Sequence, residues 1–63
     1  MAYEDIKDIF KNILEFEEQA MKLYSQVFQK TQNSAIRKQM EGLIKDETAH
    51  AVNAREALKL LEN

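Results

Sequence analysis

The chain has 63 residues, no cysteine, no proline, one glycine and a net charge of −2 at pH 7, and its charged residues, 32% in all, are of both signs. This length allows one small domain. The composition excludes disulfides and thiolate metal sites, and it shows no basic stripe for nucleic acid and no run of 18 apolar residues for a membrane span. The cytoplasm is the expected location, because the acidic N-terminus has no apolar signal core.

The elements predicted in chain order are a long helix, a short turn and a second long helix, which form one all-α domain over residues 1–63. The first helix covers about residues 4–30, the turn residues 31–34 and the second helix about residues 35–61, with boundaries accurate to about two to four residues. So short a link predicts an antiparallel two-helix hairpin.

A few single positions carry local predictions. Asn33 or Ser34 is expected to cap the second helix by accepting a hydrogen bond from an early backbone N–H. Gly42 interrupts that helix, either as a tolerated surface glycine or because another helix or a π-bulge requires it. Arg37 and Arg55 are assigned to solvated helix faces.

Each predicted helix has a glutamate at the centre of its apolar stripe. At about 100° per residue, Glu17 and Glu47 both fall in the middle of an apolar arc, and each has apolar residues at the same offsets on both sides. The shared template is either an internal pseudo-repeat or the generic pattern of an amphipathic helix. A buried, unpaired carboxylate costs several kcal/mol, so a compensating group is expected.

The turn places these two glutamates at the same level of the hairpin. Glu17 and Glu47 each lie 15 residues from Gln32, the centre of the turn, or about 22 Å along the helix axis. His50 follows Glu47 by three residues and therefore shares its helix face. The spacing predicts that the three side chains meet.

A single hairpin leaves part of each apolar arc uncovered. Two hairpins packed face to face form a four-helix bundle, the smallest arrangement that closes the core. A two-fold axis would bring Glu17, Glu47 and His50 together with their copies. Four carboxylates and two imidazoles suit two divalent ions such as iron, manganese or zinc.

Two motifs carry a resemblance to a known family. EEQAMKLY at residues 17–24 pairs a glutamate with a tyrosine seven residues later, and DETAHA at residues 46–51 contains Glu-x-x-His. With these motifs the chain resembles one half-bundle of the ferritin-like di-iron carboxylate proteins of the rubrerythrin type. Their spacing is also similar to that of the encapsulated ferritins. The resemblance covers about residues 6–60.

The resemblance implies a role for each site residue. Glu17 would be a terminal ligand, Glu47 would bridge both metals, and His50 would cap one of them. Asp46 would accept the other ring N–H of a His50 across the dimer, and Tyr24 would hydrogen-bond a ligand carboxylate. The implied cofactor is two iron ions per dimer, with manganese or zinc as alternatives.

The implied activity is oxidation of Fe(II) by oxygen or peroxide, with the site formed between two hairpins of a homodimer or a higher homo-oligomer. The alternatives are a metal-binding or iron-storage module without turnover, and a metal-free helical dimerisation module. The chain departs from a full rubrerythrin because it has no rubredoxin-like cysteine domain. A capsid shell stays open as a partner, although no docking tail is recognised.

Overall fold

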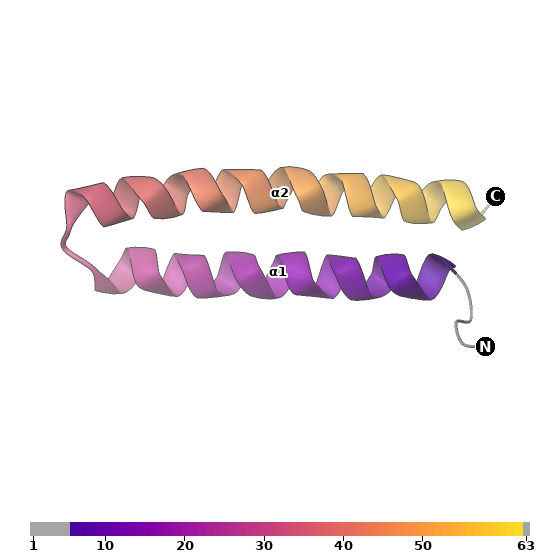
Figure 1. Ribbon diagram of the computed structural model, residues 1–63, viewed down its shortest axis with the longest axis horizontal. Helices are drawn as coiled ribbons and strands as arrows, with labels where there is room; N and C mark the ends of the chain where they lie inside the picture. The colour runs from indigo at the N-terminus through magenta and orange to yellow at the C-terminus, as the bar shows by residue number, and fades with distance from the viewer. Residues whose placement is uncertain (1–5, 63) are drawn as a thin grey trace.

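Two antiparallel helices lie side by side in the computed structural model, which describes residues 6–62 (Figure 1). Helix α1 runs Ile6–Lys30 and helix α2 runs Ser34–Glu62. Together they form a flat hairpin with principal extents of 46 × 20 × 12 Å. The predicted all-α helical hairpin is therefore confirmed.

The predicted boundaries agree closely with those of the structure. The first helix ends at Lys30 as predicted, and α2 begins and ends within one residue of the predicted 35–61. The predicted start at residue 4 lies outside the described residues. The agreement follows from local causes, since strong helix formers fill both segments and polar residues fill the turn.

The turn of residues 31–33 is held by its own side chains. Asn33 is the N-cap of α2, because its Oδ1 accepts a hydrogen bond from the Ile36 N–H at 3.0 Å. The Thr31 Oγ1 accepts the Asn33 N–H at 3.1 Å. Arg37 stacks over the Phe28 ring at 4.0 Å and donates to the Thr31 carbonyl oxygen at 3.3 Å. The assignment of Arg37 to a solvated face is therefore wrong, and this side chain ties α2 to the end of α1.

Replacing Asn33 with alanine is expected to destabilise the hairpin by about 1 kcal/mol, because the first turn of α2 loses its cap. For a domain of this size the expected fall in melting temperature is roughly 4–8 °C. Thermal unfolding followed by circular dichroism measures it. Ser34→Ala is the control and should change little, and an equal fall in both variants would contradict the assignment of the cap to Asn33.

Gly42 lies in a regular stretch of α2, where the helix shows no π-bulge. A Cβ built at Gly42 meets nothing within 4 Å. Gly42→Ala should therefore stabilise the protein by about 1 kcal/mol, the difference in helix propensity between the two residues. Denaturant unfolding measures the change. A loss of stability would show that another chain packs closely against this position.

The core of the single hairpin is small. Among the described residues only Ala51 and Ala54 are buried, with 1% and 4% exposure. The remaining contact between the helices is made by half-buried side chains, because two helices touch along one line. Over residues 6–62, ten large hydrophobic side chains are exposed: Ile6, Ile9, Ile13, Phe16, Leu23, Val27, Ile36, Val52, Leu60 and Leu61. The expectation that one hairpin cannot cover its apolar surface is confirmed.

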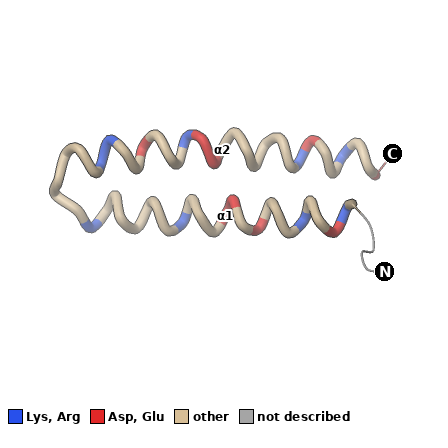
Figure 2. Tube along the Cα trace, in the orientation of Figure 1, with Lys and Arg blue, Asp and Glu red and all other residues tan. Residues whose placement is uncertain are grey.

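Charged residues of both signs are spread along the two helices, and acidic residues of both helices lie near the middle of the hairpin (Figure 2). Over the part of the chain that the structure describes, neither helix holds a stretch apolar and long enough to cross a lipid bilayer.

Candidate metal centre

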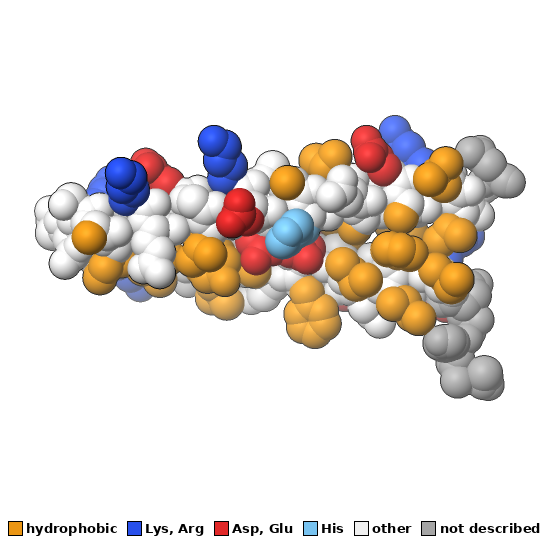
Figure 3. Space-filling model, turned by 45° about the horizontal axis from the view of Figure 1, so that its top comes forward, with side chains coloured by type: hydrophobic (Ala, Val, Ile, Leu, Met, Phe, Trp, Pro, Cys, Tyr) orange, Lys and Arg blue, Asp and Glu red, His pale blue; other side chains and the backbone are white. Residues whose placement is uncertain are grey.

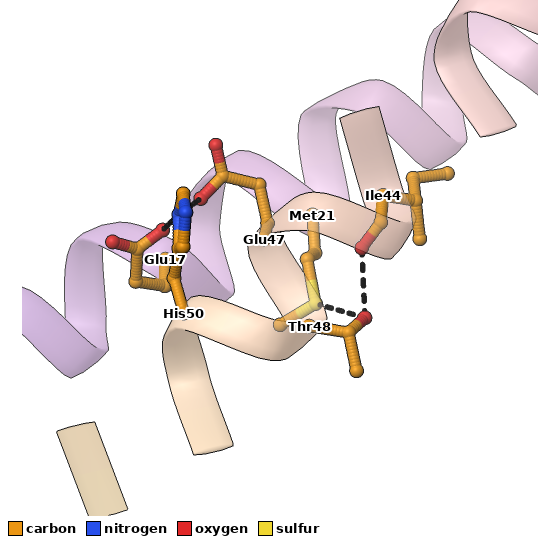
Figure 4. A network of polar contacts seen from close by, with 6 residues as sticks. All are labelled: Glu17, Met21, Ile44, Glu47, Thr48 and His50. Atoms are coloured by element: carbon orange, nitrogen blue, oxygen red, sulfur yellow. Dashed lines mark hydrogen bonds and ion pairs between the residues drawn. The ribbon is translucent and has the colours of Figure 1, made fainter. Parts of the chain in front are cut away.

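Three potential metal ligands converge at the middle of the hairpin. Glu17 comes from α1, and Glu47 and His50 come from α2 (Figure 4). The His50 Nδ1 lies 3.5 Å from the Glu17 Oε1 and 3.4 Å from the Glu47 Oε1. One ligand atom from each residue can be chosen so that all three lie within 4.8 Å of one another. The three residues predicted as ligands therefore meet, as their spacing indicated.

The direction of helical side chains explains why the histidine lies between the two glutamates. Side chains on a helix lean toward its N-terminus. Glu17 therefore leans away from the turn and Glu47 leans toward it. His50 starts about one helical turn farther from the turn and leans back, so its ring reaches the space between the two carboxylates (Figure 4).

The carboxylates are largely covered, whereas the histidine is at the surface. Side-chain exposure is 19% for Glu17 and 18% for Glu47, but 57% for His50. Figure 3 shows the histidine in pale blue above acidic side chains, with hydrophobic side chains along both sides of it. The cluster thus opens onto an apolar face of the hairpin.

The distances fit a shared cation. Ligand atoms bound tetrahedrally at about 2.1 Å from one ion lie roughly 3.4 Å apart, close to the observed separations between the His50 Nδ1 and the two carboxylates. A charge-assisted hydrogen bond would be shorter, about 2.7–2.9 Å. Two ionised carboxylates whose oxygens lie within 4.8 Å of each other also repel each other, by about 3.5 kcal/mol at that limit and an effective dielectric constant of 20, and a bound cation would relieve this repulsion.

One hairpin supplies only half of the ligand set that a dinuclear site needs. Two carboxylates and one imidazole neutralise a single divalent ion and leave coordination positions open. His50 and the open side of the cluster are accessible on one broad face. Further ligands can come from water or from a group that covers that face.

An ion pair beside the cluster was not predicted from the sequence. The Arg55 Nη2 donates to the Glu18 Oε2 at 2.7 Å, joining α2 to α1. The assignment of Arg55 to a solvated face alone is therefore incomplete. Both side chains are about half exposed, so the pair stabilises little. The sequence indicates this ion pair only weakly, because the two residues come together through the length of the arginine side chain and the direction in which it extends.

A threonine hydroxyl adds a polar contact next to the cluster. The Thr48 Oγ1 lies 2.8 Å from the carbonyl oxygen of Ile44 and 3.3 Å from the Sδ of Met21 (Figure 4). A threonine in a helix often bonds to the carbonyl four residues earlier. The contact between Thr48 and Met21 joins the two helices on the same face of the hairpin as the Arg55–Glu18 ion pair.

The two residues predicted to support the ligands lie near the cluster but do not join it within one hairpin. Tyr24 is half-buried on α1, and Asp46 is exposed on α2 directly before Glu47. Within residues 6–62 neither side chain has a hydrogen bond or an ion pair. Their roles stay predictions that concern an assembled site.

A hollow on the described surface lies away from the cluster. It has a volume of about 610 Å³ and is lined by one helix only, with Asn12, Glu15, Phe16, Glu18, Gln19 and Lys22 around it. A hollow along the outer side of a single helix is an open groove without convergent polar groups from other elements, so it is a weaker candidate for a binding site.

Comparisons with family models, with curated proteins and with solved structures find no match for this chain. The ferritin-like resemblance therefore stays a prediction from the motifs at residues 17–24 and 46–51.

Proposed function

We propose that two copies of this chain form a ferritin-like four-helix bundle and bind a dinuclear metal centre between them, where Fe(II) is oxidised by oxygen or peroxide. The observation that carries the proposal is the meeting of Glu17, Glu47 and His50 on an apolar face of the hairpin. A surface-exposed histidine beside two covered carboxylates is suited to bind a metal ion that a second hairpin encloses.

The size of the open face supports a dimer. Its extents of 46 Å by 20 Å give an area of about 900 Å², and stable protein interfaces bury about 800 Å² per partner. Exposed Ile9, Ile13 and Phe16 line this face on α1. Covering them removes apolar surface from water, which is the main driving force for association.

The assembled ligand set would be balanced in charge. Two copies of Glu17 and Glu47 supply four negative charges, which match two divalent ions. The two His50 rings complete a set that iron, manganese and zinc all accept. Iron in such a site supplies one-electron chemistry toward oxygen or peroxide, which the amino-acid side chains cannot supply themselves.

The residues of the chain would orient the metals and exclude water. Following the resemblance, Glu47 would be shared by the two metals, while Glu17 and His50 would each bind one of them. Asp46 accepts the second ring N–H of a His50, which fixes the tautomer and the orientation of the imidazole. Tyr24 points toward the centre of the bundle and donates to a ligand carboxylate. The apolar side chains around the cluster keep the site dry.

Titration with Fe(II) tests the proposal. Anaerobic addition should show saturable binding of two ions per dimer, and exposure to air should give oxidation faster than in buffer alone. Stopped-flow absorbance and metal analysis on the same sample measure rate and stoichiometry. Oxidation at the buffer rate in protein that has bound two ions would end the enzymatic part of the proposal.

A second candidate is a metal-binding module without turnover. It is favoured by the small core, since only Ala51 and Ala54 are buried within the described hairpin. A metal that binds the folded state alone stabilises it by about 2.7 kcal/mol at a hundredfold excess over Kd. A large rise in melting temperature with manganese or zinc, without faster oxidation of Fe(II), identifies this function. No change with any metal would favour the metal-free helical dimerisation module.

A further inference from the structure

The two helices of the hairpin differ along the edge that borders the open face. At about 100° per residue, four positions of each helix fall on the same side of its glutamate. They lie 8 residues and 1 residue before the glutamate, and 6 and 10 residues after it. Because the hairpin is antiparallel, this side belongs to the same broad face in both helices. On α1 the four residues are Ile9, Phe16, Leu23 and Val27, and on α2 they are Gln39, Asp46, Asn53 and Ala57.

The edge of α1 is apolar, and each of its four residues is between 43% and 75% exposed. The edge of α2 carries polar side chains, and Gln39, Asp46 and Asn53 are exposed. The template that the two helices share therefore changes from apolar to polar along this one edge. Such an edge contacts the helix that is stacked on it in a four-helix bundle.

The opposite broad face of the hairpin carries polar contacts between the two helices. Arg55 pairs with Glu18 at 2.7 Å, and the Thr48 hydroxyl contacts Met21 at 3.3 Å. A second copy therefore gains most apolar burial on the face that carries His50, where the ligand set is incomplete.

We propose that in the dimer, whose existence rests on the function proposed above, α1 packs against the partner's α1 and α2 against the partner's α2, about a two-fold axis perpendicular to the helices. This pairing buries Phe16 and Leu23 in a wholly apolar seam. A two-fold axis parallel to the helices would instead stack α1 on the partner's α2. Both contacts between the two copies would then set the apolar edge of α1 against the polar edge of α2, which leaves polar groups facing apolar ones.

The pairing also explains the polar edge of α2. When α2 packs against its own copy, the carboxylate of Asp46 comes near His50 of the partner subunit. Asp46 then accepts the ring N–H that does not face the metal, across the dimer. The metal centre is therefore completed at the α2 seam, and the α1 seam supplies most of the apolar interface.

Single-cysteine variants test the pairing, because the natural chain has no cysteine. Phe16→Cys and Asp46→Cys form a matched pair, since each residue directly precedes its glutamate and is exposed in the hairpin. A mixture of Ile9→Cys and Leu23→Cys is the second test, in case the loss of Phe16 weakens the dimer. These residues lie seven positions before and after Phe16, so each comes level with the other across an antiparallel α1 seam. Gln26→Cys, on the outer side of α1, is the control. Each variant is treated with a short bis-maleimide in the presence of Mn²⁺.

At concentrations where sedimentation shows each variant to be dimeric, the expected result is a cross-linked dimer from Phe16→Cys alone, from Asp46→Cys alone and from the mixture of Ile9→Cys with Leu23→Cys, and none from the control. In a mixture of Phe16→Cys and Asp46→Cys, mass spectrometry should find both homodimeric products and no hetero-linked product. A product that links Phe16→Cys to Asp46→Cys in this mixture, when neither variant cross-links alone, would overturn the pairing. It would favour a two-fold axis parallel to the helices.

Sedimentation of the unmodified protein with Mn²⁺ separates this inference from the function on which it rests. A dimer that binds metal but gives none of the expected cross-links overturns the pairing and leaves the proposed function standing. A monomer under these conditions overturns both.

Discussion

Replacing Glu47 with alanine is expected to abolish dinuclear metal binding. Glu47 is 18% exposed, and its Oε1 lies 3.4 Å from the His50 Nδ1. Binding of a structural metal contributes about 10–16 kcal/mol over four ligands, or roughly 3 kcal/mol per ligand. A dimer loses two ligands in this variant, so affinity should fall by roughly ten-thousandfold. Isothermal titration with Mn²⁺ measures the change.

The same variant should keep or increase the stability of the metal-free protein. A largely covered carboxylate next to a second carboxylate is removed, and its histidine contact belongs to the same helix and is solvent-exposed. Glu41→Ala is the matched control, since Glu41 is an exposed acid on the same helix. Equal metal binding by the two variants would rule out Glu47 as a ligand, and a marked loss of metal-free stability in Glu47→Ala would assign Glu47 a structural partner.

Phe16→Ala is expected to dissociate the proposed dimer at concentrations where the natural chain is assembled. Phe16 is 75% exposed in the single hairpin. Burial of such a side chain stabilises by about 1.5–3 kcal/mol, and each dimer contains two copies. The dimer Kd should rise by roughly a hundredfold to ten-thousandfold. Sedimentation velocity across a range of concentrations measures it.

Val52→Ala provides the matched control for Phe16→Ala. Val52 is an apolar residue with 44% exposure, but it projects from the side of α2 that faces away from the metal centre. This variant should dimerise like the natural chain, and circular dichroism should show the same helix content in both variants. Equal weakening of assembly by the two substitutions would mean that the interface is not built on the face that carries His50.

Much of the fold was predictable, because its causes are local. The apolar period of both helices and the polar turn at residues 31–33 specify the hairpin. The equal distance of Glu17 and Glu47 from Gln32 predicted that the two acids would meet, and their inclusion in one cluster confirms this. The capping residue was narrowed to two candidates, since Asn33 and Ser34 have similar capping propensity.

The contacts that were missed depend on how side chains extend across the seam. Arg37 and Arg55 were assigned to solvated faces, yet one stacks on Phe28 and the other pairs with Glu18. Arginine has a long apolar stem and a charged end, so its partner lies one or more turns from its own backbone position. Helical position alone therefore does not identify that partner.

The sequence by itself determined two helices of nearly equal length, the turn between them, and a glutamate at the same level on each, because periodicity and spacing fix these features without knowledge of distant contacts. The tertiary structure decided that Asn33 caps α2, that His50 lies between Glu17 and Glu47, and that the histidine stays exposed while the carboxylates are covered. These features depend on the direction in which side chains lean from two packed helices, which becomes defined only when both helices are in place.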